Sequence, residues 1–344
     1  MICRSCGKED FLDFISLKKQ PPANAFLKES DFNRERLYSL DVTCCKNCLL
    51  VQLTEDSYIP RDELFLDYAY ASSISGGLRN HFTDLANKLK SEFNPKLVVD
   101  IGSNDGNLLS NFKNHHKVLG VTPEKIGKIA IKRGINTLLK YFDRTTASLI
   151  LKKFGSAKII TATNVFAHIE DVNALMKNLL KILKKDGIFI SESHYVVSLI
   201  KTNQYDTIYH EHLRYYSLTS LKHLFNKYGM EIIHAKKINT HGGSIRDYAA
   251  KKNKFKIKKN VKKILKMEKK FINWKTFNDF RKNVVNSKLS LFSTLKKLKK
   301  LNKKIYGIGA PSRASTLINY VGLDENIIDC VLEIDGSYKI GNYV

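Results

Sequence analysis

The segment of this chain that is richest in chemically active side chains runs from Tyr205 to Ser217. It reads Tyr205-Asp-Thr-Ile-Tyr209-His210-Glu211-His212-Leu-Arg-Tyr215-Tyr216-Ser217 and places tyrosines and two histidines around a carboxylate. Such a cluster is poor packing material, because each polar group must be hydrogen-bonded if it is buried. Histidine is the natural base near neutral pH, Glu211 could orient an imidazole, and tyrosine hydroxyls could donate to a developing oxyanion. The segment therefore suits proton abstraction beside a ketone.

A metal site is the alternative interpretation of the same segment. His210 and His212 are only two residues apart, and the HExxH arrangement of zinc hydrolases is absent. The spacing therefore favours acid and base chemistry over metal binding in this segment.

Four cysteines do have the spacing of metal ligands. They form two CxxC pairs, Cys3-Arg-Ser-Cys6 and Cys45-Lys-Asn-Cys48. Each pair can bring two thiolates to one ion, and two pairs complete a tetrahedral zinc site, which is structural because no ligand position stays open. The alternative is four unpaired structural cysteines. Cys44 and Cys330 are left over, and we expect both to be buried.

A glycine-bearing loop lies between a strand and a helix start. It reads Asp100-Ile-Gly102-Ser-Asn104-Asp105-Gly106 and lacks the GxGxxG of a dinucleotide site. Glycine lets the backbone approach a ligand closely, and the acidic residues favour a cationic sulfonium over a pyrophosphate. We interpret Asp100, Gly102, Asn104, Asp105 and Gly106 as contacts of S-adenosylmethionine. A generic strand-to-helix turn is the alternative.

Further candidate contacts follow the ends of later predicted strands. Thr122 stands where enzymes that bind S-adenosylmethionine usually present a carboxylate to the cofactor ribose. Glu124 could supply that carboxylate instead. Asn164 lies at the carboxyl edge of the sheet, where such folds bind ligands, and is a predicted cofactor or substrate contact. The turn His241-Gly242-Gly243-Ser244 suits a sugar or phosphate lying against backbone amides.

The elements that must position these residues alternate between strands and helices from Leu97 onward, which predicts a mostly parallel sheet. The predicted strands are Lys96–Ile101, Lys117–Val121, Ala157–Thr163 and Gly187–Ser191, and the predicted helices are Gly106–His115, Ile126–Arg133, Arg144–Phe154 and Asp171–Lys185. A helix over Ser217–Tyr228 precedes strands Met230–Lys237 and Ile245–Ala250, which have no helix between them. This terminal antiparallel pair is typical of methyltransferases.

The length of 344 residues favours two or three domains. We expect a zinc-binding domain over residues 1–60, a methyltransferase domain over 61–253, and a lysine-rich helical linker with an incomplete Rossmann-like domain over 254–344. The last part is predicted to hold strands Lys304–Gly309 and Asn326–Leu332 around a helix at Ser312–Tyr320. No leader and no long apolar run stands in the sequence, which indicates a cytoplasmic protein without a membrane span.

Most of the net charge of +25 lies between Lys251 and Lys304, where 20 lysines and one arginine face only Glu268 and Asp279. Apolar residues recur there at helical spacing, which predicts two amphipathic helices with solvated lysine faces. An acidic partner such as RNA or an anionic membrane surface is the alternative. Because interleaved aromatic residues are sparse, the pattern argues against a nucleic-acid partner, and it leaves the oligomeric state open.

Several motifs together resemble the sugar C-methyltransferases that act on deoxythymidine-diphosphate-linked 4-keto-deoxysugars. They are the two CxxC pairs, Asp67-Tyr-Ala-Tyr70-Ala-Ser-Ser73, Asp100-Ile-Gly-Ser-Asn-Asp-Gly106, Asn164-Val-Phe-Ala-His168, Asp206-Thr-Ile-Tyr-His-Glu-His212, His241-Gly-Gly-Ser244 and Tyr306-Gly-Ile-Gly-Ala-Pro311. The resemblance implies a zinc-binding domain, a central class I S-adenosylmethionine-dependent methyltransferase domain and a C-terminal Rossmann-like domain. It also implies a nucleotide-sugar substrate bound between the latter two.

The resemblance also implies roles for single residues. His212 would abstract the proton at sugar C3, with Tyr209, Glu211 and Tyr70 around the keto-sugar, and Tyr68 is a competing choice for Tyr70. The loop from Asp100 to Gly106 and Asn164 would hold S-adenosylmethionine, and the HGGS turn would line the substrate cleft. An RNA-binding methyltransferase and a degenerate paralogue that binds sugar nucleotide without turnover are the alternatives. Thr122 departs from the family pattern, and we expect the C-terminal domain of the family to continue past the position of Val344.

Overall fold

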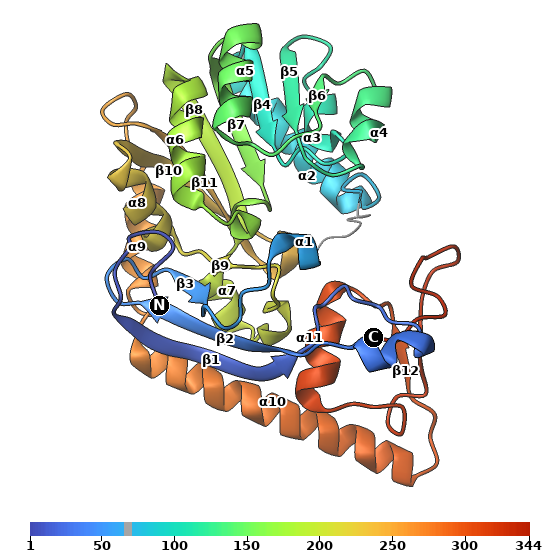
Figure 1. Cartoon of the computed structure of the whole chain (residues 1–344). Coiled ribbons are helices and arrows are strands. Elements are labelled where there is room, and N and C mark those ends of the chain that lie inside the picture. Colours follow the sequence, from blue (N-terminus) through green and yellow to red (C-terminus); the bar gives the residue numbers. More distant parts are fainter. Residues whose placement is uncertain (65–70) are drawn as a thin grey trace.

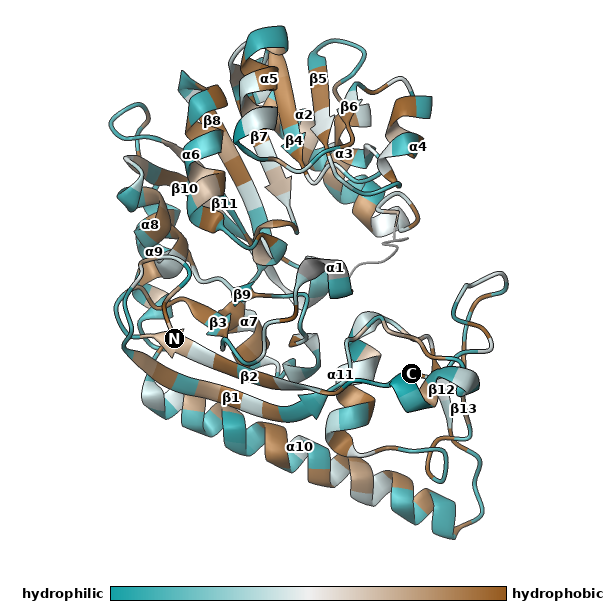
Figure 2. Ribbon diagram, in the orientation of Figure 1, coloured by the Kyte–Doolittle hydropathy of each residue, from teal (hydrophilic) through white to brown (hydrophobic). Residues whose placement is uncertain are grey.

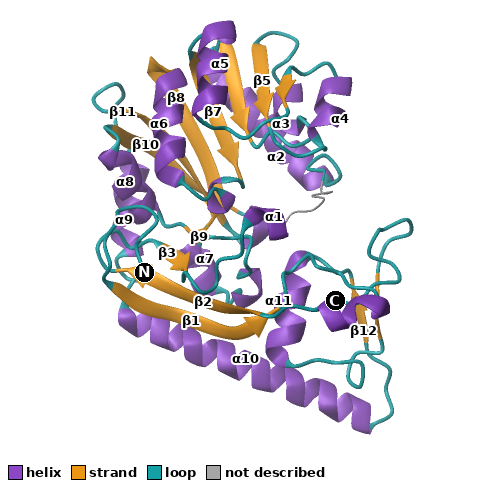
Figure 3. Ribbon diagram, viewed as in Figure 1, coloured by secondary structure: helices purple, strands orange, loops and turns teal. Residues whose placement is uncertain are grey.

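The computed structural model describes residues 1–64 and 71–344, and Figure 1 shows its arrangement. The predicted site residue Tyr70 and its competitor Tyr68 lie outside the described residues. Within the described part, no helix is both long and apolar enough to cross a membrane. Figure 3 shows strands gathered in a central sheet and a second, N-terminal sheet, with a small C-terminal unit beside the latter.

The N-terminal sheet has the strand order β1-β2-β3-β9 among the described residues. Its strands are β1 (Phe11–Gln20), β2 (Tyr38–Cys45), β3 (Val51–Leu53) and β9 (Arg214–Tyr215), and the 3-10 helix η1 (Glu29–Arg34) lies between β1 and β2. β9 pairs with β3 in antiparallel fashion, Val51 opposite Tyr215 and Gln52 opposite Arg214. The sheet that starts beside the cysteines is thus completed by the strand that follows His212.

The central sheet has the order β10-β11-β8-β7-β4-β5-β6 among the described residues. Its strands are β4 (Leu97–Ile101), β5 (Lys117–Val121), β6 (Thr137–Leu138), β7 (Ala157–Thr163), β8 (Leu183–His194), β10 (Met230–Ile238) and β11 (Ser244–Lys251). β4 to β8 pair in parallel, whereas β11 is antiparallel to both β8 and β10. The predicted alternation and terminal antiparallel pair are confirmed. The two-residue β6 is too short for its pattern to be recognised in the sequence.

The two faces of the central sheet pack against different helices, because successive strand residues point to opposite sides. Val98 of β4 belongs to a core shared with α2 (Gly76–Phe93), α3 (Asn107–Ser110) and α4 (Gly127–Lys132). Its neighbour Val99 belongs to the core shared with α5 (Arg144–Phe154), α6 (Val172–Ile182) and α8 (Leu218–Lys227). Helices therefore cover both faces, and the loops at the carboxyl ends of the parallel strands stay available for a site.

Short elements form the connections near this edge of the sheet. They are α1 (Arg61–Leu64), α7 (Val196–Lys201) and the 3-10 helices η2 (Phe166–His168), η3 (Tyr205–Thr207) and η4 (Thr240–Gly242). Many of the predicted site residues fall on or between these elements.

The lysine-rich tract forms the two predicted helices, α9 (Lys259–Glu268) and α10 (Trp274–Lys300). α10 packs against β1 at its beginning, where the ring of Phe14 lies 5.1 Å from that of Phe277. Figure 2 shows hydrophilic and hydrophobic residues alternating along α10, and Leu289 further along the helix is 60% exposed. α10 therefore packs against the N-terminal sheet over its first part and is mostly exposed further along.

The C-terminal unit contains the parallel strands β12 (Tyr306–Ile308) and β13 (Cys330–Leu332) with α11 (Ser312–Val321) between them. This matches the predicted order of elements, with shorter strands. Ile308 is 89% exposed, so this small sheet leaves apolar surface uncovered. Cys330 is exposed, so the expectation that it is buried is wrong. Its strand is too short and too open to cover it.

Glu268, one of the two acids of the lysine tract, is fully buried at the end of α9. Its carboxylate accepts hydrogen bonds from the Tyr195 hydroxyl (2.7 Å), from the backbone N–H groups of Leu218 (2.7 Å) and Thr219 (2.8 Å), and from the Thr219 hydroxyl. The N–H groups belong to the start of α8, where a helix leaves its donors unsatisfied and favours a negative charge. Glu268 thus caps α8 from another helix.

We expect Glu268→Gln to lower the free energy of unfolding by about 3 kcal/mol, because an amide cannot accept from all these donors and loses the charge. Urea unfolding followed by circular dichroism measures the loss. Glu325→Gln, at an exposed position after α11, serves as the matched control. A loss below about 1 kcal/mol would show that the cap is dispensable.

Candidate active site

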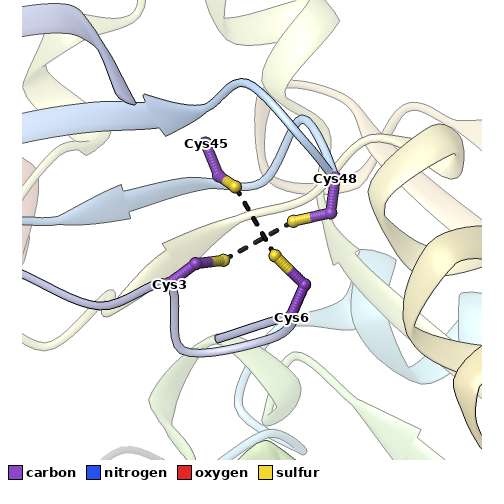
Figure 4. Close-up of side chains that lie close together, drawn as sticks. All are labelled: Cys3, Cys6, Cys45 and Cys48. Atoms are coloured by element: carbon purple, nitrogen blue, oxygen red, sulfur yellow. Dashed lines mark hydrogen bonds between the residues drawn. The ribbon is translucent and has the colours of Figure 1, made fainter. Parts of the chain in front are cut away.

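The predicted zinc ligands lie together. The Sγ atoms of Cys3 and Cys48 are 3.5 Å apart, those of Cys6 and Cys45 are 3.6 Å apart, and all four lie within 4.8 Å of one another (Figure 4). Four thiolates at about 2.3 Å from one zinc ion in a tetrahedron would be separated by about 3.8 Å. The donor set and its spacing therefore fit a structural zinc ion. Burial raises the pKa of the neighbouring Cys44 thiol to about 12, so this residue stays a protonated core cysteine.

The glycine loop after β4 has the backbone that the sequence predicts. Gly102 and Gly106 adopt positive φ angles of 72° and 79°, and a Cβ on Gly102 would lie 2.2 Å from Val165. Only glycine therefore fits at the first position. Asp100 is buried below the loop and accepts a hydrogen bond from Thr161 (2.6 Å) on β7, and burial raises its pKa to about 7. It ties two neighbouring strands together beneath the loop.

Asn104 and Asp105 hold the segment that precedes α2. The Asn104 side chain accepts from the backbone N–H of Ser72 (2.9 Å), and the Asp105 carboxylate accepts from the Ser72 hydroxyl (2.7 Å). Arg133 lies 3.3 Å from the same carboxylate. Burial opposes ionisation of Asp105, but hydrogen bonds from Ser73 and Ser72 outweigh it and lower its pKa. Both side chains thus shape the wall of the loop, and direct cofactor contact by either stays a prediction.

Thr122 and Glu124 form one polar unit at the end of β5. The buried Thr122 hydroxyl donates to the Glu124 carboxylate at 2.6 Å. Position 122 therefore lacks a carboxylate, but Thr122 holds the carboxylate of Glu124 two residues later. A carboxylate can accept from both hydroxyls of a ribose, so Glu124 fits the ribose-binding function that the sequence predicts for Thr122.

We expect Glu124→Gln to weaken S-adenosylmethionine binding roughly tenfold, because charge-assisted hydrogen bonds to the ribose are lost. Isothermal titration calorimetry measures the dissociation constant. Glu92→Gln, at the exposed far end of α2, is the matched control. An unchanged affinity would assign ribose binding to another group.

Asn164 and His168 lie at the carboxyl end of β7. Asn164 has a positive φ of 57°, and its N–H donates to the carbonyl of Glu192 on β8 (2.9 Å). His168 belongs to η2, and its ring lies 4.8 Å from the ring of His212 in an edge-on arrangement. The end of β7 is therefore joined both to the next strand and to the histidine-rich segment.

His212 has the geometry of a base. Its Nδ1 donates to the Thr207 carbonyl (3.1 Å), which leaves the lone pair on Nε2, and Nε2 accepts from the Tyr209 hydroxyl (3.1 Å). Burial, followed by the nearby His168 and His194, holds the pKa of His212 well below its usual value. The imidazole is thus neutral at pH 7 and presents an acceptor nitrogen next to a tyrosine hydroxyl.

Glu211 binds a residue of the N-terminal domain. Asn24 donates its amide N–H to the Glu211 carboxylate, which is 5% exposed. Burial raises the pKa of Glu211 to about 7, and the hydrogen bond from Asn24 opposes this rise. His210 Nε2 donates to the Ser39 carbonyl (3.1 Å). The two histidines of the segment therefore have different surroundings, which supports His212 alone as the candidate base.

The HGGS turn sits over the ends of β8 and β11. His241 has a positive φ of 51°, the Gly242 carbonyl accepts from Gln204 (2.7 Å), and the Gly243 carbonyl accepts from the Tyr195 N–H (3.1 Å). The Ser244 hydroxyl is buried and donates to the Thr240 carbonyl (3.1 Å). The turn is thus fixed by Gln204 and Tyr195, next to the tyrosine and histidine segment.

Several polar residues of this edge lack a recognisable sequence signal. Glu192 on β8 is fully buried and binds both Arg246 and His81, the latter at 2.8 Å. His194 contacts Gln204 at 3.2 Å, and burial lowers its pKa to about 4. Buried polar atoms without a partner among the described residues include three at this edge, namely Ser193 Oγ, His194 Nδ1 and Thr240 Oγ1. Polar atoms of a ligand would satisfy such groups.

Comparison with known proteins assigns the family. A model described as a methyltransferase domain matches residues 57–235, which is more than half of the chain. A model described as a putative zinc binding domain matches residues 3–65, and one described as a C-methyltransferase C-terminal domain matches residues 239–344. The chain belongs to the methyltransferase-domain family. The methyltransferase domain uses S-adenosylmethionine as its cofactor and has a Rossmann-like central sheet, and the zinc-binding match together with the four close cysteines assigns zinc.

Individual proteins are similar to this chain over different lengths. It is 35% identical to the C-methyltransferase NovU of Streptomyces niveus over 254 residues, which are 72% of this chain and 60% of NovU, so it spans less than two thirds of that relative. A magnesium protoporphyrin IX methyltransferase of Synechocystis PCC 6803 with bound SAH is 14% identical and covers 51% of this chain and 84% of its own, with a TM-score of 0.41. The YcgJ protein of Bacillus is 16% identical and covers 51% and 100%, with a TM-score of 0.38.

Proposed function

We propose that this C-methyltransferase methylates a ring carbon next to the ketone of a nucleotide-linked deoxysugar, of the deoxythymidine-diphosphate 4-keto type. The observation that carries the proposal is the geometry of His212. Its Nδ1–H is fixed on a carbonyl and its neutral Nε2 faces a tyrosine hydroxyl. Methylation at carbon requires such a base, because a C–H proton has to leave before the carbon becomes a nucleophile.

The residues of the site divide the remaining tasks. S-adenosylmethionine supplies an electrophilic methyl group when it is bound. The glycine loop, Glu124 and Asn164 would hold it at the carboxyl edge of the sheet. His212 would take the proton at sugar C3, and the Tyr209 hydroxyl would donate to the enolate oxygen. The HGGS turn would line the sugar nucleotide from the other side, next to the unpartnered polar atoms of Ser193, His194 and Thr240.

The proposal includes three domains, with boundaries at residues 60 and 253. The segment that carries His212 lies between the central sheet and the N-terminal sheet, which β9 completes. α11 contacts the same segment from the C-terminal side, where Arg313 pairs with Asp206 at 2.6 Å. The base thus sits where the three parts of the chain meet.

The test is transfer of label from methyl-labelled S-adenosylmethionine to a panel of deoxythymidine-diphosphate 4-keto-deoxysugars. We expect the label on a ring carbon adjacent to the ketone, located by NMR. Absence of transfer to the whole panel, with cofactor binding demonstrated by calorimetry, would contradict the proposal. Transfer to a sugar oxygen would contradict the assignment of carbon as the acceptor.

A further inference from the structure

We propose that Asn24 is a positioning residue that holds the Glu211 carboxylate beside the His212 segment, and that it does so as one link in a chain that reaches α11 through Ser312. This inference rests on the proposed function, since it concerns the same site. It gives a role to two motifs that have none in the proposed chemistry. They are Gln20-Pro21-Pro22-Ala23-Asn24 and the glycine-rich turn before Ser312.

The link consists of two hydrogen bonds made by one amide. Asn24 Nδ2 donates to Glu211 Oε1, and Asn24 Oδ1 accepts from the Ser312 hydroxyl at 2.8 Å. Two prolines restrict the backbone just before Asn24, and a turn bond from the Ala25 N–H to the Pro22 carbonyl (3.0 Å) fixes its direction. Residues from the beginning, the middle and the end of the chain therefore meet at this side chain.

α11 is held on the same segment by further contacts. Arg313 pairs with Asp206 at 2.6 Å, the Thr316 hydroxyl donates to the Ile208 carbonyl at 2.9 Å, and the ring of Tyr320 lies 5.4 Å from that of Tyr205. Ser312 starts this helix. Its hydroxyl can reach Asn24 only while α11 stays docked, so the support of Glu211 depends on the C-terminal part of the chain.

The residues between β1 and η1 also pack toward the C-terminus. The ring of Phe26 lies 6.2 Å from that of Tyr338, and Lys339 lies 5.1 Å from the centre of the Phe26 ring. The Tyr343 N–H donates to the Leu27 carbonyl at 2.8 Å. This packing fixes the segment of Asn24 against the C-terminal part, so the amide is presented to Glu211 by a supported loop.

An amide is suited to hold a carboxyl group in either charge state. When Glu211 is ionised, Nδ2 donates to it and Oδ1 accepts from Ser312. When Glu211 is protonated, a half-turn of the amide lets Oδ1 accept the carboxyl proton while Nδ2 donates to the serine oxygen. An apolar residue could fill the space but could not do this. A contact that served packing alone would not need both functions.

Other groups near Glu211 also affect the charge state of its carboxyl group. Tyr58, His168 and Glu170 line the same small pocket as Glu211, together with apolar residues. Tyr338 approaches from the C-terminal segment, and its pKa is raised by burial first and then by the Glu211 charge. Against this background, the hydrogen bond from Asn24 favours the ionised form of the Glu211 carboxylate, which burial opposes.

Asn24→Leu tests the link, since leucine is similar in size and cannot hydrogen-bond. We expect kcat to fall about 10- to 100-fold, as for loss of a group that orients the catalytic machinery. The dissociation constant for S-adenosylmethionine should stay within about twofold of the native value. The acidic limb of the pH profile of kcat/KM should move to higher pH, because the ionised form of Glu211 loses its donor. Asn24→Gln, which retains the amide, should recover part of the activity.

Thr316→Val is the matched control, because it removes one α11 contact with the same segment and leaves Asn24 intact. Its pH profile should keep the native acidic limb, whereas Ser312→Ala should move that limb in the same direction as Asn24→Leu. Native kcat and pH profile in Asn24→Leu would overturn the proposal. Equal losses in Asn24→Leu and Thr316→Val, accompanied by equal drops in thermal midpoint, would reduce Asn24 to a packing residue.

A second measurement separates this inference from the proposed function. In protein labelled with carbon-13 at the glutamate carboxyl, the Glu211 signal is identified by its loss in Glu211→Gln. Its titration midpoint should rise in Asn24→Leu and Ser312→Ala and stay unchanged in Thr316→Val. This result supports the link even if no sugar nucleotide of the panel is methylated. An unchanged midpoint in Asn24→Leu contradicts it whether or not the enzyme turns over.

Discussion

Replacement of His212 by asparagine is expected to lower kcat for methyl transfer about 10²- to 10⁴-fold, the usual range for loss of a general base. Asparagine can still donate toward the Thr207 carbonyl, which accepts from the native Nδ1 at 3.1 Å. It cannot offer a basic nitrogen at the position of Nε2. Affinity for S-adenosylmethionine should stay within about twofold, because the glycine loop and Glu124 are untouched. Rapid-quench kinetics and calorimetry measure the two quantities separately.

The exposed His223 on α8 provides the control, since His223→Asn removes an imidazole without touching the site. Tyr209→Phe should cost less than His212→Asn, about tenfold, because it removes the hydroxyl that donates to Nε2 in this structure and would turn to the enolate oxygen when Nε2 takes the sugar proton. An activity of His212→Asn above about one tenth of the native value would assign proton abstraction to another residue.

The pH dependence of activity follows from the surroundings of the same ring. Burial and the neighbouring histidines lower the pKa of His212, so its neutral form persists as the pH falls below 6.5. The loss of activity that is due to His212 should therefore appear on the acidic side of that value. Glu211, with a pKa of about 7, titrates above it. A limb near pH 7 that disappears in Glu211→Gln would belong to Glu211 and not to the base.

Local patterns predicted most of the central sheet and the zinc ligands. The alternation of strands and helices from Leu97 onward, the glycine loop and the pair β10 and β11 all have short-range signals, and the structure confirms them. The same holds for the two CxxC pairs, because the two cysteines of each pair are only three positions apart in the sequence. In each case the chemistry or the periodicity is complete within a few residues of the chain.

Contacts between distant segments could not be read from such patterns. Asn24 and Glu211 are 187 positions apart and Ser312 is 288 positions from Asn24, so no periodicity relates them. Glu268 stands in a tract of lysines and gives no sign that it caps α8. The insert that holds Phe26 packs on Tyr338 of the C-terminal segment. Side chains that act across domains are specified by the tertiary fold, and local patterns identify only the residues that carry them.

Removal of zinc is expected to abolish methyl transfer, although the ion lies outside the proposed site. Cys45 ends β2 and Cys48 lies between β2 and β3. β3 pairs with β9, which begins two residues after His212. The guanidinium of Arg214 on β9 donates to the carbonyls of Ile169 and Glu170, directly after His168. Loss of the ion would therefore free β3 and then β9. His168 and His212, which are held through β9, would lose their fixed positions as a pair.

The turn from Cys3 to Cys6, which we call the zinc knuckle, also supports the central domain directly. Asn173 at the start of α6 donates to the Arg4 carbonyl, and Lys227 at the end of α8 donates to the Ser5 carbonyl, both at 2.9 Å. Both carbonyls lie between the ligands Cys3 and Cys6. Structural zinc contributes on the order of 10 kcal/mol to the folding of small domains. Its loss should thus unfold the N-terminal sheet and uncover the faces of α6 and α8 on which the knuckle lies.

Cys48→Ser tests this coupling, with Cys330→Ser as the control, since Cys330 is exposed and is not part of the cluster. We expect one zinc ion per native chain, little or none in Cys48→Ser, a thermal midpoint lower by about 10 °C or more, and loss of transfer. A chelator that removes zinc from the native protein should reproduce both losses, and zinc added back should reverse them. Full activity in a zinc-free chain would show that β9 and the histidine pair hold their positions without the ion, and the path from the cysteines through β3 to His212 would then be wrong.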